Sequence, residues 1–197
     1  MKIYDISQEV FSSCVWEGDP APERRVLCSI EKGDVINLTA FSMCAHNGTH
    51  IDAPSHFLRD GKNVEEIAIS KLVGKAYVAD HSGNVDRAVA VDIIRKARAA
   101  EPEALKRILV KGNSTLTYDA AEAFAEAGIV LYGNESQTVG PEDAPAAVHR
   151  LLLGKEIVLL EGIRLREVPE GVYLLFAAPL NLAGAEGAPC RAVLIEL

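Results

Sequence analysis

The stretch IVLYGNESQTVGPEDAPAAVHRLLLGKEIVLL, residues 129–160, decides the fold class. Its two ends, Ile129 to Tyr132 and Ile157 to Leu160, are short apolar runs typical of buried strands. Between them, Ala144 to Leu153 is compatible with a helix and is followed by Gly154, a residue common just past a helix end. A strand, a helix and a second strand in this order predict a parallel unit with a right-handed crossover.

The preceding segment continues the same alternation. Ala76 to Asp80 and Arg107 to Lys111 have the apolar character of strands, whereas Asp86 to Ala100 and Tyr118 to Ala127 have that of helices. Gly128 stands at the usual position after the second of these helices. The pattern therefore predicts a small parallel sheet.

Both ends of the chain are predicted to form β structure. The expected strands are Ile3 to Ile6, Arg25 to Glu31, Val35 to Cys44, Val172 to Ala178 and Arg191 to Glu196. With 197 residues, of which 49% are hydrophobic, the chain is long enough to enclose one substantial core. We therefore expect a single α/β domain over residues 1–197, with a parallel β-α-β unit between two β regions.

Charge and composition exclude several classes of protein. The net charge of -8 argues against a nucleic-acid-binding surface, and the one basic cluster, residues 95–98, falls on the exposed face of a predicted helix. No run approaches the ~20 apolar residues of a membrane span. The first residues contain Asp5 and no long apolar core, so we expect no signal peptide. The four cysteines form no Cys-x-x-Cys pair, which favours free thiols in a cytoplasmic protein.

The reactive side chains are concentrated in HNGTHIDAPSH, residues 46–56. This run holds three of the five histidines and one aspartate, at spacings of four, two and four. Imidazole and carboxylate are the ligands that zinc, manganese and related ions take. The same residues could be loop histidines and an aspartate in a turn, but four of them within eleven residues favour a metal or catalytic site. His56, at the end of the run, is close enough to act without binding the ion.

The local geometry of this run supports a metal site. Gly48 and Pro54 exclude a continuous helix. In an extended segment His50 and Asp52 point the same way, and a turn around Gly48 can return His46 to them. Three ligands leave open positions on the ion, as in catalytic rather than structural metal sites.

Other candidate residues lie outside the run. Glu161 follows a predicted strand, and ligands in parallel sheets bind at the carboxyl ends of strands, although a capped strand end explains it equally well. From the residues alone, His149 is interpreted as a surface helix histidine beside Arg150, and His81 as a solvated turn residue. Cys44 is interpreted as a small buried hydrophobe rather than a ligand.

Taken together, these residues resemble the cyclase family of metal-dependent hydrolases, whose best-known members are bacterial kynurenine formamidases. Residues 46–56 match the family signature His-x-Gly-Thr/Ala-His-x-Asp-Ala-Pro-x-His at every fixed position. The other matching segments are VWEGDP at 15–20, LEGI at 160–163, VPEGVY at 168–173, APL at 178–180 and the tail from 184 to 194.

The resemblance implies two divalent metal ions per subunit. Zinc is expected, and the ligand types also suit manganese or nickel. His46, His50 and Asp52 would hold the first ion. Asp52 would also bridge to the second ion, completed by His149 and Glu161. The resemblance therefore makes His149 a metal ligand, whereas the residues alone indicate a surface histidine.

The resemblance also implies a fold and an activity. His56 would be the catalytic acid and base, and Trp16 would line the pocket and stack on an aryl substrate. The family fold is a swivelling β/β/α domain in dimers or larger oligomers. The implied reaction is the hydrolysis of a small-molecule amide, N-formylkynurenine, to kynurenine and formate in tryptophan catabolism.

Three segments depart from the family pattern. Glu135 replaces an aspartate in 133–138, residues 186–189 lack a serine, and 112–117 lacks the aromatic residues expected of a formylkynurenine pocket. None of these affects the expected ligands, but all are expected where the substrate is selected. A hydrolase of another cyclic or acyl amide, such as an isatin-like lactam, is therefore the close alternative.

Two further classes of function remain open on the sequence. A lyase or true cyclase could use the same ions as Lewis acids. A non-catalytic metal-binding module could keep the same scaffold, although it would not need the additional histidine His56.

Overall fold

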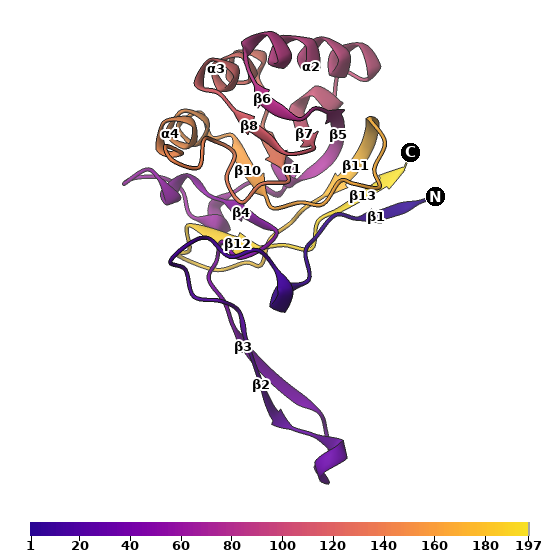
Figure 1. Cartoon of the computed structure of the whole chain (residues 1–197), viewed down its shortest axis with the longest axis vertical. Coiled ribbons are helices and arrows are strands. Elements are labelled where there is room, and N and C mark those ends of the chain that lie inside the picture. The colour runs from indigo at the N-terminus through magenta and orange to yellow at the C-terminus, as the bar shows by residue number, and fades with distance from the viewer. Residues whose placement is uncertain (197) are drawn as a thin grey trace.

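The computed structural model describes residues 1–196, and its centre is one sheet of nine strands (Figure 1). The strands are β1 (Ile3–Asp5), β4 (His50–Asp52), β5 (Val73–Asp80), β7 (Arg107–Lys111), β9 (Leu131–Asn134), β10 (Val158–Glu161), β11 (Gly171–Phe176), β12 (Gly187–Pro189) and β13 (Val193–Glu196). Their order across the sheet is β1-β13-β11-β5-β7-β9-β10-β4-β12. The neighbours β5, β7, β9 and β10 are parallel and the outer pairs are antiparallel. This confirms a mixed α/β fold with a parallel unit.

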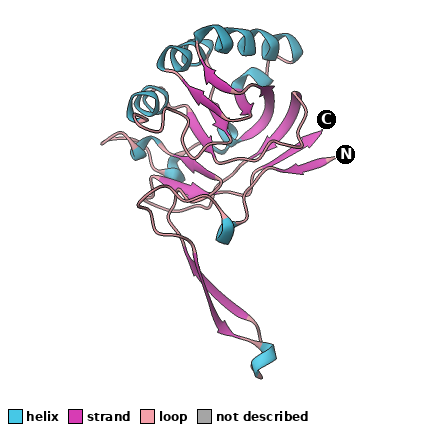
Figure 2. Cartoon of the chain, in the orientation of Figure 1, coloured by secondary structure: helices cyan, strands magenta, loops and turns pink. Residues whose placement is uncertain are grey.

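Three helices cover one face of the sheet, as Figures 1 and 2 show. They are α2 (Arg87–Ala100), α3 (Tyr118–Ala127) and α4 (Ala146–Gly154). The first begins at Asp86, whose carboxylate accepts a hydrogen bond from the Val89 amide at 2.9 Å. The third helix matters most for function, because it places His149 beside the end of β10.

Side chains that alternate along the central strands form two cores. On β7, Ile108 and Val110 pack into the core beneath the helices, whereas Leu109 packs into the core on the opposite face. The second core also takes Leu72 from the short helix α1 (Ile69–Leu72). Both faces of the parallel strands are therefore buried, which explains their continuous apolar runs.

Short elements complete the chain. The 3-10 helices are Val10–Ser12, Ile30–Lys32, Pro54–His56, Val64–Glu66 and Ala104–Lys106. A small parallel pair joins β6 (Gly83–Val85) and β8 (Ser114–Leu116). No helix in residues 1–196 is long and apolar enough to cross a membrane.

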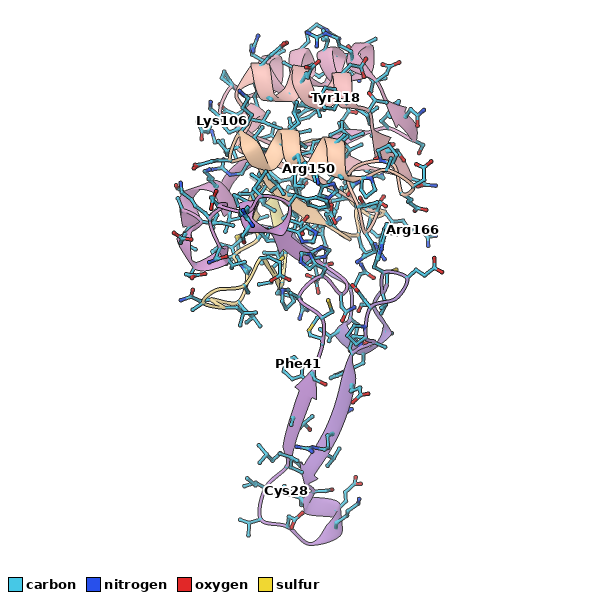
Figure 3. The ribbon with its side chains drawn as sticks, turned by 90° about the vertical axis from the view of Figure 1, so that its left-hand side faces the viewer. Cys28, Phe41, Lys106, Tyr118, Arg150 and Arg166 are labelled. Atoms are coloured by element: carbon cyan, nitrogen blue, oxygen red, sulfur yellow. The ribbon has the colours of Figure 1, made fainter. Side chains whose placement is uncertain are left out.

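A long hairpin projects from this body (Figures 1 and 2). It is formed by β2 (Glu23–Cys28) and β3 (Leu38–Ser42), which pair antiparallel, and we call residues 23–42 the arm. Figure 3 shows Phe41 in the half of the arm nearer the body and Cys28 near its far end. Both strands were expected to be longer, but a 3-10 turn and extended loop occupy residues 29–37 instead.

Some expected bounds match the structure and others are shifted. The strand over 107–111 and the helix over 118–127 match residue for residue. Gly154 was expected to follow its helix but is its last residue, and the chain turns at Glu156, whose φ is 55°. The short strands β4 and β12 were not expected as strands, because each has only three residues and is defined by pairing with a distant segment.

Gly162 is a backbone position where only glycine fits, and it ties β10 to the loop before β4. Its φ is +68°, and a Cβ atom there would overlap the Gln137 side chain and the Gly48 carbonyl. Gly154 provides a matched control, because a Cβ atom there would have no neighbour within 4 Å.

We expect Gly162→Ala to lower the free energy of unfolding by about 2–4 kcal/mol, from left-handed strain plus steric overlap. Gly154→Ala should leave the stability unchanged or raise it by up to ~1 kcal/mol. Urea unfolding measures both variants. Equal stability of the two variants would show that the loop moves freely around Gly162.

Candidate metal centre

The pairing of β4 with β10 brings three acidic and basic side chains together. His50 and Asp52 lie two apart on β4 and share one face, as expected, while Ile51 between them is buried on the other. The register places Glu161 opposite His50. The Nε2 atom of His50 is 3.3 Å from an Asp52 oxygen and 3.4 Å from a Glu161 oxygen.

His46 reaches the same point from the loop before β4. The chain turns at Gly48, whose φ of +67° is left-handed, and the Nδ1 atom of His46 lies 2.9 Å from Asp52 Oδ1. The backbone of Gly187 on β12 packs against the His46 ring, where a Cβ atom would be 2.5 Å from Cε1. The turn expected around Gly48 is therefore present.

His149 approaches from α4 and is 2% exposed. Its Nδ1 atom donates to the Pro145 carbonyl at 2.8 Å, and its Nε2 atom lies 3.1 Å from Glu161 Oε1 and 3.6 Å from Asp52 Oδ2. The interpretation of His149 as a surface histidine is wrong, because the turn of α4 that carries it faces the end of β10.

The backbone fixes the tautomers of two imidazoles. His50 Nδ1 donates to the Gly48 carbonyl at 3.0 Å, as His149 Nδ1 does to Pro145. A carbonyl can only accept, so each Nδ1 carries a proton and each Nε2 faces the carboxylates. Histidines that bind metals are commonly oriented in this way.

Two groups of possible metal ligands share the Asp52 carboxylate. His46, His50 and Asp52 form one, and Asp52, His149 and Glu161 form the other, with ligand atoms within 4.8 Å of one another in each group. Asp52 is 0% exposed, and its Oδ2 atom and His50 Nε2 have no hydrogen-bond partner among the described residues. Unpaired buried polar atoms are costly, so this donor set fits bound divalent cations of the zinc, manganese or nickel type.

The electrostatics of the ion-free site are dominated by these carboxylates. Burial opposes protonation of His50, but the adjacent carboxylates of Asp52 and Glu161 outweigh it and raise the pKa of His50 to about 10. The same balance raises the pKa of His149. Burial alone would raise the pKa of Asp52, but its imidazole neighbours hold that pKa well below its usual range.

His56 lies beside this centre and belongs to neither ligand group. Its ring stacks on His46, with 4.1 Å between ring centroids, and meets the Phe57 ring edge-on. Burial lowers the pKa of His56, which favours the neutral imidazole.

A cleft of about 380 Å³ opens over the centre. Its walls include Trp16, Asp19 and Cys44, which precede the motif at 46–56 in the sequence. Gln137 and Glu186, from later segments, also line it. Trp16 is 37% exposed and so is not a core residue. A second cavity, of about 520 Å³, lies across residues 47–49 and contains none of the possible ligands.

Two expectations about nearby residues are corrected. Cys44 is not a buried hydrophobe, since it lines the cleft and its thiol lies 3.5 Å from Asp19 Oδ2. Glu135 does not line the cleft, because its carboxylate accepts hydrogen bonds from the amides of Gly112 and Leu165 at 2.6 and 2.7 Å. Of the segments that depart from the family pattern, Gln137, Thr138 and Glu186 do line the cleft.

His81 lies away from the centre, but in the link between β5 and β6 and not in the expected turn, since Gly83 and Asn84 belong to β6. Its Nε2 atom is 3.1 Å from the Asn84 carbonyl oxygen. Asp19 and Glu186 are the cleft residues that the sequence did not single out for a role. Sequence alone gave little reason to choose them, because each is a single carboxylate in a segment that was quoted only for its match to the family.

Comparison with known proteins agrees with this geometry. The chain is 33% identical to the kynurenine formamidase of Salinibacter ruber, covering 98% of this chain and 97% of that protein. It is 34% identical to the kynurenine formamidase of Bacillus anthracis, with the same coverage of each. A solved structure described as a potential metal-dependent hydrolase with cyclase activity superposes with a TM-score of 0.80 at 27% identity, covering 98% of this chain and 96% of that one.

More distant structures share the fold. Isatin hydrolase A from Labrenzia aggregata superposes with a TM-score of 0.82 at 21% identity, over 98% of this chain and 93% of that one. The Cyclase family model itself matches residues 4–141. With that match and relatives more than 30% identical along almost their whole length, the chain belongs to the Cyclase family.

Proposed function

We propose that the protein is a metal-dependent amide hydrolase that converts N-formylkynurenine to kynurenine and formate. The observation that carries this proposal is the pair of ligand groups that share buried Asp52, because their other members all line one open cleft. The relatives named kynurenine formamidase support the substrate, since they match this chain over nearly its full length.

The ions are proposed to be two divalent cations, zinc first and manganese or nickel as alternatives. His46, His50 and Asp52 would hold one, and Asp52, His149 and Glu161 the other. When bound, such ions supply Lewis acidity, which lowers the pKa of water and polarises a carbonyl group.

The protein's own residues then organise the reaction. Water adds to the formyl carbon and the C–N bond breaks, giving formate and the aryl amine. His56 is proposed to accept the proton from the attacking water and to deliver it to the leaving nitrogen, a role that its neutral imidazole suits. Trp16 is proposed to hold the aryl ring of the substrate against the cleft wall.

Turnover of N-formylkynurenine by the metal-loaded protein, followed by absorbance, tests this function. We expect His56→Ala to lower kcat by about 10²–10⁴-fold, the usual contribution of acid–base catalysis, with its metal content unchanged. His81→Ala, which removes a histidine at the surface, is the matched control and should keep wild-type kcat.

Other outcomes contradict parts of this proposal. Metal loss in His56→Ala would make His56 a ligand, and full metal content in Asp52→Ala would exclude the bridging role. No turnover of N-formylkynurenine by protein that carries its ions would move the substrate to another amide or to an isatin-like lactam.

Metal binding should release protons. In the ion-free protein His50 has a pKa of about 10 and so is protonated near neutral pH, whereas a ligand imidazole must lose that proton. We therefore expect metal affinity to rise from about pH 6 to about pH 8, with roughly one proton released from His50. Calorimetry of zinc binding in two buffers of different ionisation enthalpy measures this release, and zero protons released would show that His50 is neutral before the ion binds.

We also propose that the protein is a homo-oligomer assembled through the arm. Large apolar residues are exposed on it: Val26, Leu27, Ile30, Val35, Ile36, Leu38 and Phe41. An exposed apolar surface of this kind on one projecting element is typical of a site of protein–protein contact. The 520 Å³ cavity at the base of the arm, lined by Phe11, Phe41 and Leu180, offers apolar surface of matching chemistry on a second copy.

A charged substitution in the loop that joins β2 and β3 tests whether the arm forms the interface. Val35 is 94% exposed, so Val35→Asp should not disturb the folded chain, but it should place an unpaired charge in the interface. We expect analytical ultracentrifugation to show a dimer or tetramer for the wild type and a shift toward monomer for this variant. Val91→Asp, at an exposed valine on α2, is the control. A monomeric wild type would exclude the assembly.

A further inference from the structure

Two carboxylates at the cleft, Asp19 and Glu186, belong to neither group of possible metal ligands. They come from distant parts of the chain, one from the loop before the arm and the other from the segment before β12. Asp19 Oδ2 is 3.5 Å from the Cys44 sulfur and Glu186 Oε1 is 3.4 Å from Nε2 of His46, and all four residues line the cleft. The two carboxylates therefore face the same part of the cleft, and we call them the acidic rim.

The acidic rim has no lysine or arginine side chain to balance it among the described residues. Within residues 1–196, neither Asp19 nor Glu186 forms an ion pair with a lysine or arginine, and the described walls of the cleft contain neither residue type. The nearest ionisable partner of Glu186 is His46, whose Nε2 atom lies 3.4 Å from Glu186 Oε1. Two carboxylates of like charge beside one cleft create a negative potential that favours a cationic ligand group.

Independent features show that this cleft is built to take a ligand. His50 lines the cleft, and its Nε2 atom is buried without a hydrogen-bond partner in the described chain. Trp16 lines the same cleft, and the face of an indole ring attracts cations as well as aryl groups.

We infer that Asp19 and Glu186 bind a primary ammonium group on the substrate and so determine specificity. This inference rests on the proposed function, because N-formylkynurenine carries such an ammonium group at the far end of the chain from its formamide. The α-carboxylate of the same amino acid has no basic partner in the cleft walls, so it would face solvent. The floor of the cleft would then select the amide and the acidic rim would select the amino acid.

A matched pair of substrates tests this specificity. One is N-formylkynurenine, and the other is 4-(2-formamidophenyl)-4-oxobutanoate, which lacks only the amino group. We expect the wild type to prefer the first in kcat/KM. Asp19→Asn and Glu186→Gln should each reduce this preference by about 5–10-fold, the effect of a charge-assisted hydrogen bond discounted for partial exposure. Glu17→Gln is the control, because it makes the same change from carboxylate to carboxamide at an exposed residue two positions from Asp19, and it should keep the wild-type preference.

A binding measurement separates this inference from the proposed function. Kynurenine and its desamino analogue can be titrated into the protein, with quenching of Trp16, the chain's single tryptophan, as the signal. We expect kynurenine to bind more tightly than the analogue and each rim variant to lose that difference, even if neither formamide is hydrolysed. Metal content is measured in parallel, because Glu186 also contacts His46.

The inference is overturned if both rim variants keep the wild-type ratio of affinities. It is also overturned if Glu186→Gln loses metal while Asp19→Asn has no effect, since Glu186 would then act on His46 rather than on the substrate. A failure of both formamides to react, with the kynurenine preference intact, would count against the proposed reaction and leave the acidic rim supported.

Discussion

The complete burial of the Asp52 carboxylate is the constraint on which the rest of the site depends. A buried, ionised carboxylate is strongly unfavourable unless it is paired, so the chain must bring cationic or metal partners to it. It does so with imidazoles from the preceding loop, from β4 itself and from α4. The alternation of β4 fixes the register, because a slip of one residue would exchange Asp52 with the core residue Ile51.

Pairing of strands in the sheet brings together site residues that are far apart in the sequence. Glu161 lies more than a hundred residues from His50, yet the antiparallel register of β4 and β10 places them opposite each other. The Val139 amide donates to Glu161 Oε1 at 2.8 Å, which helps to fix the side chain that His149 also contacts. Because these contacts come from regular strands and a helix, the floor of the cleft is rigid, as a metal centre requires.

Much of this could be read from the sequence, and the failures have physical causes. The parallel strands were predictable because burial on both faces leaves continuous apolar runs, and the motif at 46–56 was predictable because its spacing matches an extended strand and a turn. The burial of His149 was not predictable from its neighbours, since the side that α4 presents to β10 depends on tertiary packing. The interpretation of Cys44 was wrong because an apolar neighbourhood in sequence does not show that the chain leaves the arm there and runs along the cleft.

The floor and the rim of the cleft therefore differ in what holds them. All the ligand residues except His46 lie on the sheet and on α4, and His46 lies in the loop before β4. Asp19 and Cys44, in contrast, lie in the segments that lead into and out of the arm, residues 23–42. An interface formed by the arm would affect these segments first and the sheet last. Assembly through the arm would then position the cleft wall at Asp19 and Cys44, which contacts the substrate. The metal ligands would all still come from one chain. Within the altered segment 186–189, only Glu186 precedes the sheet, because β12 pairs with β4 and places Gly187 opposite Asp52, so substrate choice can change at this rim position without moving Asp52.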